Sequence, residues 1–262
     1  MKVLGIVGLD YCGSTVVSNV LSGLPGTVNV GESHWILDRN LRCKECGKAP
    51  CPVFHGTLLD KLKSADIEND SWWEIISLGT GAELIVSSDK LPKHYDRFGV
   101  PNYLIFLYKD PRANIFSWCK RKFEYDLSDA PSIISTEHIE IGINWWVNIT
   151  IQMADWLEKQ KSDVSVVSLE NFTINTREMV RGISSWLAME YDPSAIDYWN
   201  RELHYIGGNH SVKRMKPNQH FYNKIAIDER WRESISPQDS ERIRNSNEIW
   251  ALIDRIKEFS ER

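Results

Sequence analysis

Long apolar runs are missing from this sequence. No stretch approaches the roughly 18 apolar residues that a membrane-spanning helix requires. The first residues read as an apolar strand, unlike the charged-then-apolar pattern of a secretory leader. We therefore expect a soluble, cytoplasmic protein without a membrane span.

An excess of positive charge is missing too. The chain carries 31 Lys and Arg residues against 36 Asp and Glu, a formal net charge of −5. This balance argues against a nucleic-acid partner, so any anion site has to be built locally by a few residues. No internal repeat or low-complexity linker divides the sequence. With 262 residues and 42% hydrophobic content, we expect one domain over residues 1–262. The sequence does not indicate an oligomeric state.

The sequence has few cysteines, and their number is odd. Five cysteines in a chain of this length do not suggest a disulfide framework. Three of them form the pattern Cys43-x2-Cys46-x4-Cys51-x3-His55, in a Cys-rich insertion at about residues 40–56. The spacing suits either a zinc knuckle or an unmetallated, loop-packed cluster. In both cases the role is structural, because four closed ligands leave no open position for chemistry.

What the sequence does contain, at its start, is a strand, a glycine turn and a helix. Residues 2–7 are an apolar run suited to a buried strand, and Gly8 to Gly13 then bend the chain before apolar residues recur at helical spacing. The N–H groups at such a helix N-terminus bind phosphate or sulfate. The spacing is that of a phosphate loop, but Ser14 replaces the usual lysine, which weakens assignment as a kinase or ATPase. A glycine turn that binds nothing is the alternative.

A second anion site is predicted after the most apolar strand, at residues 103–108. Asp110 and Pro111 suit the N-cap and first position of a helix. Lys109 and Ser117 offer a cation and a hydroxyl beside that helix N-terminus, and Arg112 lies in the same turn.

Two further polar side chains fall at predicted strand ends, where α/β sheets present functional groups. Glu32 follows an extended segment over 27–30 and could act as a general base, or simply cap the next helix. Lys90 follows the strand at 83–87 and could be functional or a flexible surface lysine.

The remaining periodicity completes an α/β fold of the P-loop nucleotide-binding type, with a mostly parallel central sheet flanked by helices. A further strand is predicted at 164–169. Helices are predicted at 57–62, 71–76, 136–160 and 176–189, with one charged helix from about 236 to the end.

These motifs, in this order, resemble the sulfotransferase superfamily, in its bacterial and carbohydrate-type branch. The resemblance rests on the first glycine loop, on Lys109 and Ser117 eight residues apart, on the lysine-bearing segment 87–92 and on the segments 167–172 and 204–209. The cysteine-rich insertion is similar to one common in that branch. The similarity extends over nearly the whole chain.

The resemblance implies an enzyme that moves a sulfonate group from 3′-phosphoadenosine-5′-phosphosulfate (PAPS) to an acceptor hydroxyl, releasing PAP. It implies catalytic roles for Glu32 as base and Lys90 at the leaving oxygen, and no metal in the chemistry. The acceptor would be a small molecule, carbohydrate or peptide. The donor would contact the following residues: Tyr11, Cys12, Gly13, Ser14, Thr15, Lys109, Arg112, Ser117, Gly208 and Asn209.

Some positions depart from the family pattern. Tyr11 stands where the family has a cation beside the transferring sulfonate, and Lys109 replaces an arginine. A non-catalytic PAPS- or PAP-binding protein and a P-loop small-molecule kinase are therefore the alternatives. Residues 207–223, which include Arg214, form either a lid over the nucleotide or an exposed loop without function.

Overall fold

Five parallel strands form the centre of the molecule in the computed structural model, which describes residues 1–40, 42–43, 45–66, 68–125, 133–209, 212 and 223–261. Their order across the sheet is β2-β3-β1-β4-β5, and every pairing is parallel. The bounds are β1 Lys2–Val7, β2 Thr27–Gly31, β3 Leu84–Lys90, β4 Tyr103–Tyr108 and β5 Asp163–Ser168. Each predicted strand is therefore confirmed.

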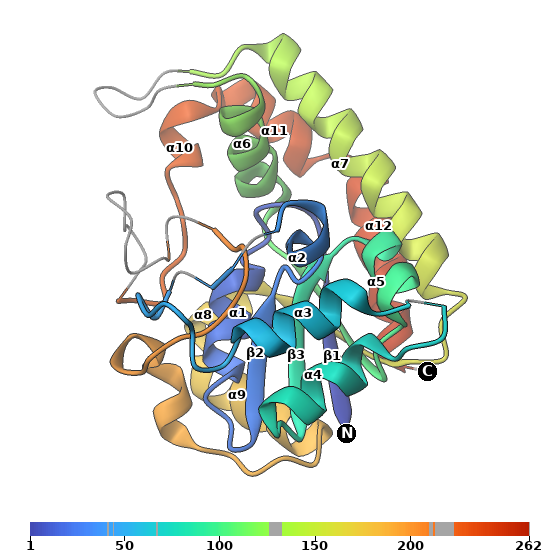
Figure 1. Cartoon of the computed structure of the whole chain (residues 1–262). Helices are drawn as coiled ribbons and strands as arrows, with labels where there is room; N and C mark the ends of the chain where they lie inside the picture. Colours follow the sequence, from blue (N-terminus) through green and yellow to red (C-terminus); the bar gives the residue numbers. More distant parts are fainter. Residues whose placement is uncertain are drawn as a thin grey trace.

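Helices cover both faces of the sheet (Figure 1). Alternate strand residues point to opposite faces, so Leu4 and Ile6 pack on one side while Val3 and Val7 pack on the other. The first face is covered by α1 Ser14–Leu21, α8 Leu169–Ile174, α9 Thr176–Trp186 and the short 3-10 helices η1 Pro193–Ile196 and η2 Tyr198–Asn200. The second is covered by α3 Gly56–Ser64, α4 Trp72–Thr80, α5 Pro92–Phe98 and parts of α7 Thr136–Leu157 and α12 Asn247–Lys257.

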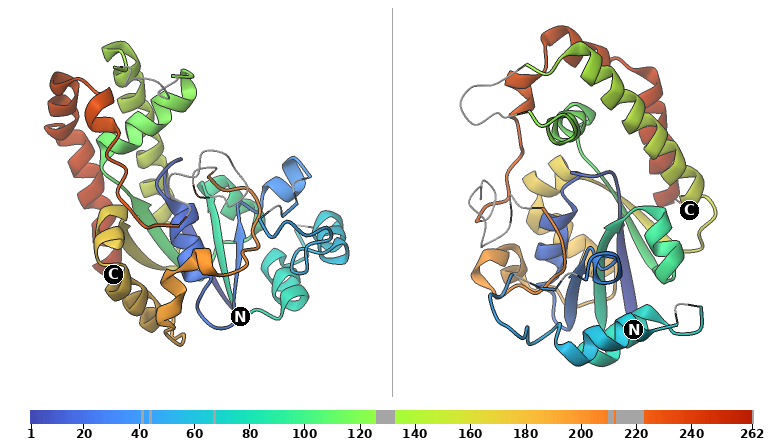
Figure 2. Two further views of the ribbon diagram at one scale, coloured as in Figure 1. Left: turned by 90° about the vertical axis from the view of Figure 1, so that its left-hand side faces the viewer. Right: turned by 45° about the horizontal axis from the view of Figure 1, so that its top comes forward.

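A third apolar cluster lies beyond the carboxyl ends of the strands (Figure 1). It joins α6 Pro111–Lys122, α7, α10 Trp231–Ser234, α11 Pro237–Arg244 and α12, while α2 Trp35–Asp38 and η4 Glu258–Glu261 complete the structure. Figure 2 shows α7 and α12 running side by side. Among the described residues, no helix is long and apolar enough to cross a bilayer.

The single C-terminal helix predicted from about residue 236 is wrong. The segment forms two helices, α11 and α12, separated at Asn245 and Ser246. The Ser246 side chain accepts a hydrogen bond from the Ile249 N–H at 3.4 Å. This N-cap starts a new helix inside a pattern whose apolar spacing alone looks continuous.

Candidate active site

The glycine loop after β1 has the geometry of an anion-binding turn. Gly13 is the N-cap of α1 at φ 96°, in the left-handed region that favours glycine. A Cβ there would lie 2.6 Å from a terminal methyl group of Leu169, which would have to move, so the backbone conformation is the main reason for glycine at this position. Tyr11 also has positive φ, 65°, a strained conformation for a residue with a side chain.

The N-terminus of α1 points its first N–H groups out of the helix. The helical bonds begin with the N–H groups of Val16 and Val17, which both donate to the Gly13 carbonyl at 3.0 and 3.3 Å. The N–H groups of Ser14 and Thr15 therefore precede the helical hydrogen bonds, and the N-cap residue Gly13 has no side chain that could accept from them. Cys12 beside them is buried, which raises the pKa of its thiol and keeps it neutral.

Lys90 links the glycine loop to the end of β2. Its Nζ donates to Glu32 Oε1 at 2.8 Å and lies 3.1 Å from Asp10 Oδ1. Burial on its own would lower the pKa of Lys90, but the charges of Glu32 and Asp10 outweigh it and raise that pKa above its ordinary value. Lys90 therefore stays an ammonium at neutral pH, and two carboxylates face it.

Glu32 is held on its other side as well. Trp35 Nε1 donates to Glu32 Oε2 at 2.7 Å, and the Glu32 backbone N–H donates to the Ile206 carbonyl at 2.8 Å. The Glu32 side chain is only 14% exposed. The structure thus brings together Glu32 and Lys90, which are 58 residues apart in the sequence.

Asp89 fixes the two elements that carry these side chains, a role that the sequence analysis missed. Its buried carboxylate accepts from Ser33 Oγ at 2.7 Å and from the His34 N–H at 3.0 Å, and lies 2.6 Å from His34 Nδ1. Burial alone would raise the pKa of Asp89, but the hydrogen bonds from His34 and Ser33 hold it below its usual range. A fixed negative charge therefore ties the segment after Glu32 to the strand end that carries Lys90.

Asp10 is the second residue that the sequence analysis missed. Its carboxylate is half exposed and is the loop's own contribution to the Lys90 ion pair. An acidic residue inside a predicted anion-binding loop was visible in the sequence, but its partner Lys90 lies 80 residues away. The side chain at Asp10 lowers the positive potential that a bound anion would meet.

Replacing Asp10 with Asn is expected to tighten binding of PAP about three- to tenfold at low salt. The change removes a negative charge from the loop and keeps the side-chain shape, and the gain should shrink as salt rises because the group is half exposed. Titration calorimetry at two ionic strengths measures this. Glu83→Gln, at the opposite end of the sheet, is the matched control. If the Asp10 variant bound PAP more weakly, the main effect of the carboxylate would be to stabilise the loop conformation and not to repel the bound anion.

The second predicted anion site is also present as a pair. Lys109 follows β4 and donates from Nζ to Ser117 Oγ at 3.0 Å, while Ser117 Oγ donates to the Ala113 carbonyl at 2.9 Å. Lys109 is only 6% exposed. Burial lowers the pKa of Lys109 to about 8, and among the described residues no carboxylate forms an ion pair with it.

That pKa makes PAP binding dependent on pH. A phosphate beside Lys109 favours the ammonium, so affinity should be constant below about pH 8 and should fall at higher pH, by up to about tenfold per pH unit, as the free protein loses this proton. Calorimetry from pH 7.5 to 9.5 should also detect proton uptake on binding. Lys109→Arg keeps its charge throughout this range, and is expected to abolish the dependence. A wild-type affinity that is flat to pH 9.5 would contradict the assignment.

Arg112 and the Asp110 cap lie at the N-terminus of α6, as predicted. Asp110 accepts from the Arg112 N–H at 2.9 Å, and its carboxylate also pairs with the Arg112 guanidinium. The guanidinium lies over the Trp231 ring, 4.3 Å from its centroid. Arg112 therefore fixes α10 against α6 in this structure, and a contact between Arg112 and the donor stays a prediction.

Gly208 and Asn209 lie against the first loop. The Asn209 N–H donates to Thr15 Oγ1 at 3.0 Å, and Ile206 pairs with Gly31 at the end of β2. The predicted donor contacts of Gly208 and Asn209 thus belong to the same edge of the sheet as Ser14 and Thr15. Most of the proposed lid, residues 210–211 and 213–222 with Arg214, lies outside the described residues.

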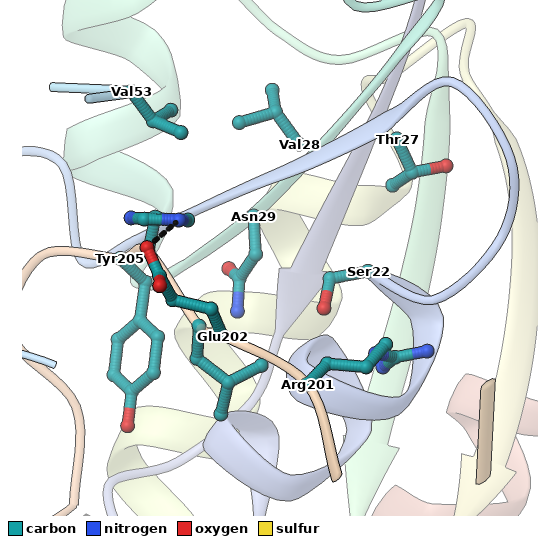
Figure 3. Close-up of a pocket in the computed structure, with 10 residues that line it drawn as sticks. Ser22, Thr27, Val28, Asn29, Val53, Arg201, Glu202 and Tyr205 are labelled. Carbon is teal, nitrogen blue, oxygen red and sulfur yellow. Dashed lines mark ion pairs between the residues drawn. The ribbon is translucent and has the colours of Figure 1, made fainter. Parts of the chain in front are cut away.

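The proposed fourth member of the cysteine cluster is corrected by the structure. His55 is not with the cysteines, because its Nδ1 accepts the Leu58 N–H at 3.3 Å and caps α3. His204, from the far end of the chain, lies there instead. A small pocket beside this cluster, between Ser22, Asn29 and the segment 201–205, is drawn in Figure 3. It borders the end of α1 remote from the glycine loop, so it is separate from the candidate active site.

Comparison with solved structures identifies the fold. A sulfotransferase domain from the curacin biosynthetic pathway aligns with a TM-score of 0.58 and 14% identity, over 92% of this chain and 95% of that one. A sulfotransferase from Alicyclobacillus acidocaldarius aligns with a TM-score of 0.51 and 13% identity, over 100% and 96%. Mouse sulfotransferase SULT7A1 complexed with PAP gives 0.49 and 12%, over 97% and 88%. No protein-family model matches the sequence, and no curated protein matches it. The likeness to the first two structures shows that the five-stranded parallel sheet and its flanking helices have the fold of these sulfotransferases.

Proposed function

We propose that this protein is an enzyme that transfers a sulfonate group from PAPS to an acceptor hydroxyl. The observation that carries the proposal is the Lys109–Ser117 pair with its buried lysine. Lys109 directly follows β4, the strand next to β1, and β1 leads into the glycine loop. A donor with a phosphate at each end of its ribose needs two anion sites at one sheet edge. The sulfotransferase fold supports the same conclusion.

The residues present fit the donor's two anionic ends. The N–H groups of Ser14 and Thr15, with their hydroxyls, suit the 5′-phosphosulfate at the N-terminus of α1. Lys109 and Ser117 suit the 3′-phosphate, since an ammonium and a hydroxyl both donate to phosphate oxygens. Lys109 is buried without an ion-pair partner among the described residues, and an anion would supply the missing charge.

The chemistry then needs a base and a cation. PAPS supplies an activated sulfonate whose leaving group is a phosphate oxygen. Glu32 accepts the proton of the acceptor hydroxyl, and Lys90, which stays protonated, stabilises negative charge on the leaving oxygen. Lys90 contacts Asp10 in the glycine loop as well as Glu32, so its ammonium joins the base to the donor loop. Sulfonate transfer depends mainly on such positioning and charge stabilisation.

A non-catalytic PAPS- or PAP-binding protein is the second candidate. Two observations favour it over other classes: Tyr11 replaces the cation expected in the loop, and Lys90 is neutralised by two carboxylates. Such a protein would bind through Lys109 and Ser117 without turning over the donor. The binding and turnover measurements below separate the two.

Calorimetric titration with PAP, 5′-AMP and ATP with Mg²⁺ tests the nucleotide class. We expect PAP to bind tightly and 5′-AMP, which lacks the 3′-phosphate, to bind at least about 100-fold more weakly. Preference for ATP with Mg²⁺ would indicate a kinase and overturn the proposal. PAP release from PAPS is then followed against a panel of phenols, sugars and tyrosine peptides. Binding without turnover of any acceptor would favour the non-catalytic candidate.

A further inference from the structure

Three cysteines of the insertion and one distant histidine converge on a single point. Each of Cys43, Cys46, Cys51 and His204 offers one ligand atom, and the four atoms lie within 4.8 Å of one another. The Cys43 and Cys46 sulfurs are 4.0 Å apart, and Cys51 Sγ is 3.4 Å from His204 Nδ1. A tetrahedral zinc site with Zn–S bonds of about 2.3 Å separates its ligand atoms by about 3.8 Å. The cluster therefore already has the size of such a site.

Backbone N–H groups point toward two of the sulfurs. Cys43 Sγ accepts hydrogen bonds from the N–H groups of Glu45 and Cys46, and Cys51 Sγ accepts the Phe54 N–H at 3.3 Å. Gly47, directly after Cys46, has φ 65°, which lets the chain turn sharply around the first two sulfurs. Cys43 and Cys51 are buried, 6% and 5% exposed. Buried thiolates need a nearby positive charge, and a metal ion supplies it.

His204 is oriented by a second set of contacts. Its Nε2 lies 3.2 Å from Glu202 Oε1, the ion pair drawn as a dashed line to Glu202 in Figure 3. Lys48 Nζ in turn donates to both Glu202 oxygens, at 2.8 and 2.6 Å. Glu202 therefore holds the proton on Nε2 and leaves the Nδ1 lone pair facing the sulfurs. A carboxylate behind the histidine is the usual outer contact of a metal-bound imidazole.

We propose that Cys43, Cys46, Cys51 and His204 bind one structural Zn²⁺ ion. Three thiolates and one imidazole are a ligand set that zinc prefers in closed tetrahedral sites, and the intracellular reducing environment that we expect favours metal over a disulfide. All four positions are taken by protein atoms, so the ion has no catalytic role.

The site connects two segments that are far apart in the sequence. It joins the insertion to the segment 202–209, which has little regular secondary structure of its own. Two residues beyond His204, Ile206 accepts the Glu32 N–H, and Asn209 contacts Thr15. The zinc ion therefore anchors the segment that contacts both the predicted base and the glycine loop.

Metal analysis of the full-length protein, purified under reducing conditions and dialysed without added metal, tests the site. We expect one zinc ion per chain, released in equal amount when a mercurial modifies the thiols. Cobalt substitution should give the intense visible absorption of a tetrahedral cobalt thiolate. Cys46→Ser and His204→Ala should lose the metal. Cys119→Ser, a free cysteine outside the cluster, and His55→Ser, which preserves the helix cap, should keep it.

Three results would overturn the proposal. One is a wild-type protein with five free thiols that takes up neither zinc nor cobalt. Another is a Cys43–Cys46 disulfide in the purified protein, shown by thiol counting. The third is retention of the metal by His204→Ala together with its loss from His55→Ser. The first two measurements use unmodified protein, so they do not depend on whether a variant folds, and none of them depends on nucleotide binding.

Discussion

Glu32→Gln is expected to lower the rate of sulfonate transfer about 10²–10⁴-fold and to leave PAP binding within about threefold of wild type. The range is that of a lost general base. Gln keeps the size of the side chain and one oxygen that can accept from either Lys90 or Trp35, so one of the two hydrogen bonds survives and the amide NH2 faces the other donor. What disappears is the carboxylate that takes the acceptor proton. The measurement is PAP release with the best acceptor of the panel, beside calorimetry with PAP.

Two control variants separate base chemistry from positioning. Trp35→Phe removes the 2.7 Å hydrogen bond to Glu32 Oε2 but leaves the carboxylate, so a loss of about tenfold or less is expected. Asp38→Asn changes an exposed carboxylate in α2 that pairs with Arg97, and should leave the rate unchanged. If Glu32→Gln lost rate and PAP affinity together, or lost neither, Glu32 would not be the base.

The strands were predictable from the sequence because their signal is local. Residues 103–108 are apolar at every position, and β4 is buried on both faces, so pattern and environment agree. Asp110 and Pro111 likewise specify the start of α6 within two residues. The C-terminal helix was mispredicted for the converse reason. Apolar spacing continues through Ser246, and the competing preference is the capping bond of one serine hydroxyl.

The contacts within the site were less predictable, because they join residues far apart in the sequence. Spacing made His55 the natural fourth partner of the cysteines, whereas the residue that lies there, His204, is 153 residues from Cys51. The same holds for Asp10 and Lys90, whose ion pair depends on β1 and β3 being neighbours in the sheet. Sequence patterns identify which side chains end up at the carboxyl edge of a parallel sheet. They do not specify which of those side chains pair there.

Replacing Lys109 and Ser117 together with Ala is expected to weaken PAP binding at least about 100-fold at pH 7.5, while 5′-AMP binding changes little. Hydrogen bonds to a charged phosphate contribute about 1.5–3 kcal/mol each, and the variant removes two donors and one positive charge. Ser117→Ala alone should cost about tenfold. Calorimetry with both nucleotides isolates the 3′-phosphate, because only PAP carries it.

Thermal stability makes this test discriminating. The folded protein buries the Lys109 ammonium, and this burial lowers its pKa to about 8. Burying that charge therefore destabilises the folded protein when no nucleotide is bound. A residue that serves the fold would destabilise the protein when removed, whereas Lys109→Ala should leave the melting temperature unchanged or raise it. Lys122→Ala, exposed at the C-terminal end of α6, is the control and should alter neither the melting temperature nor the PAP affinity. A lower melting temperature with unchanged PAP affinity would make Lys109 a structural residue and remove the observation on which the proposed function rests.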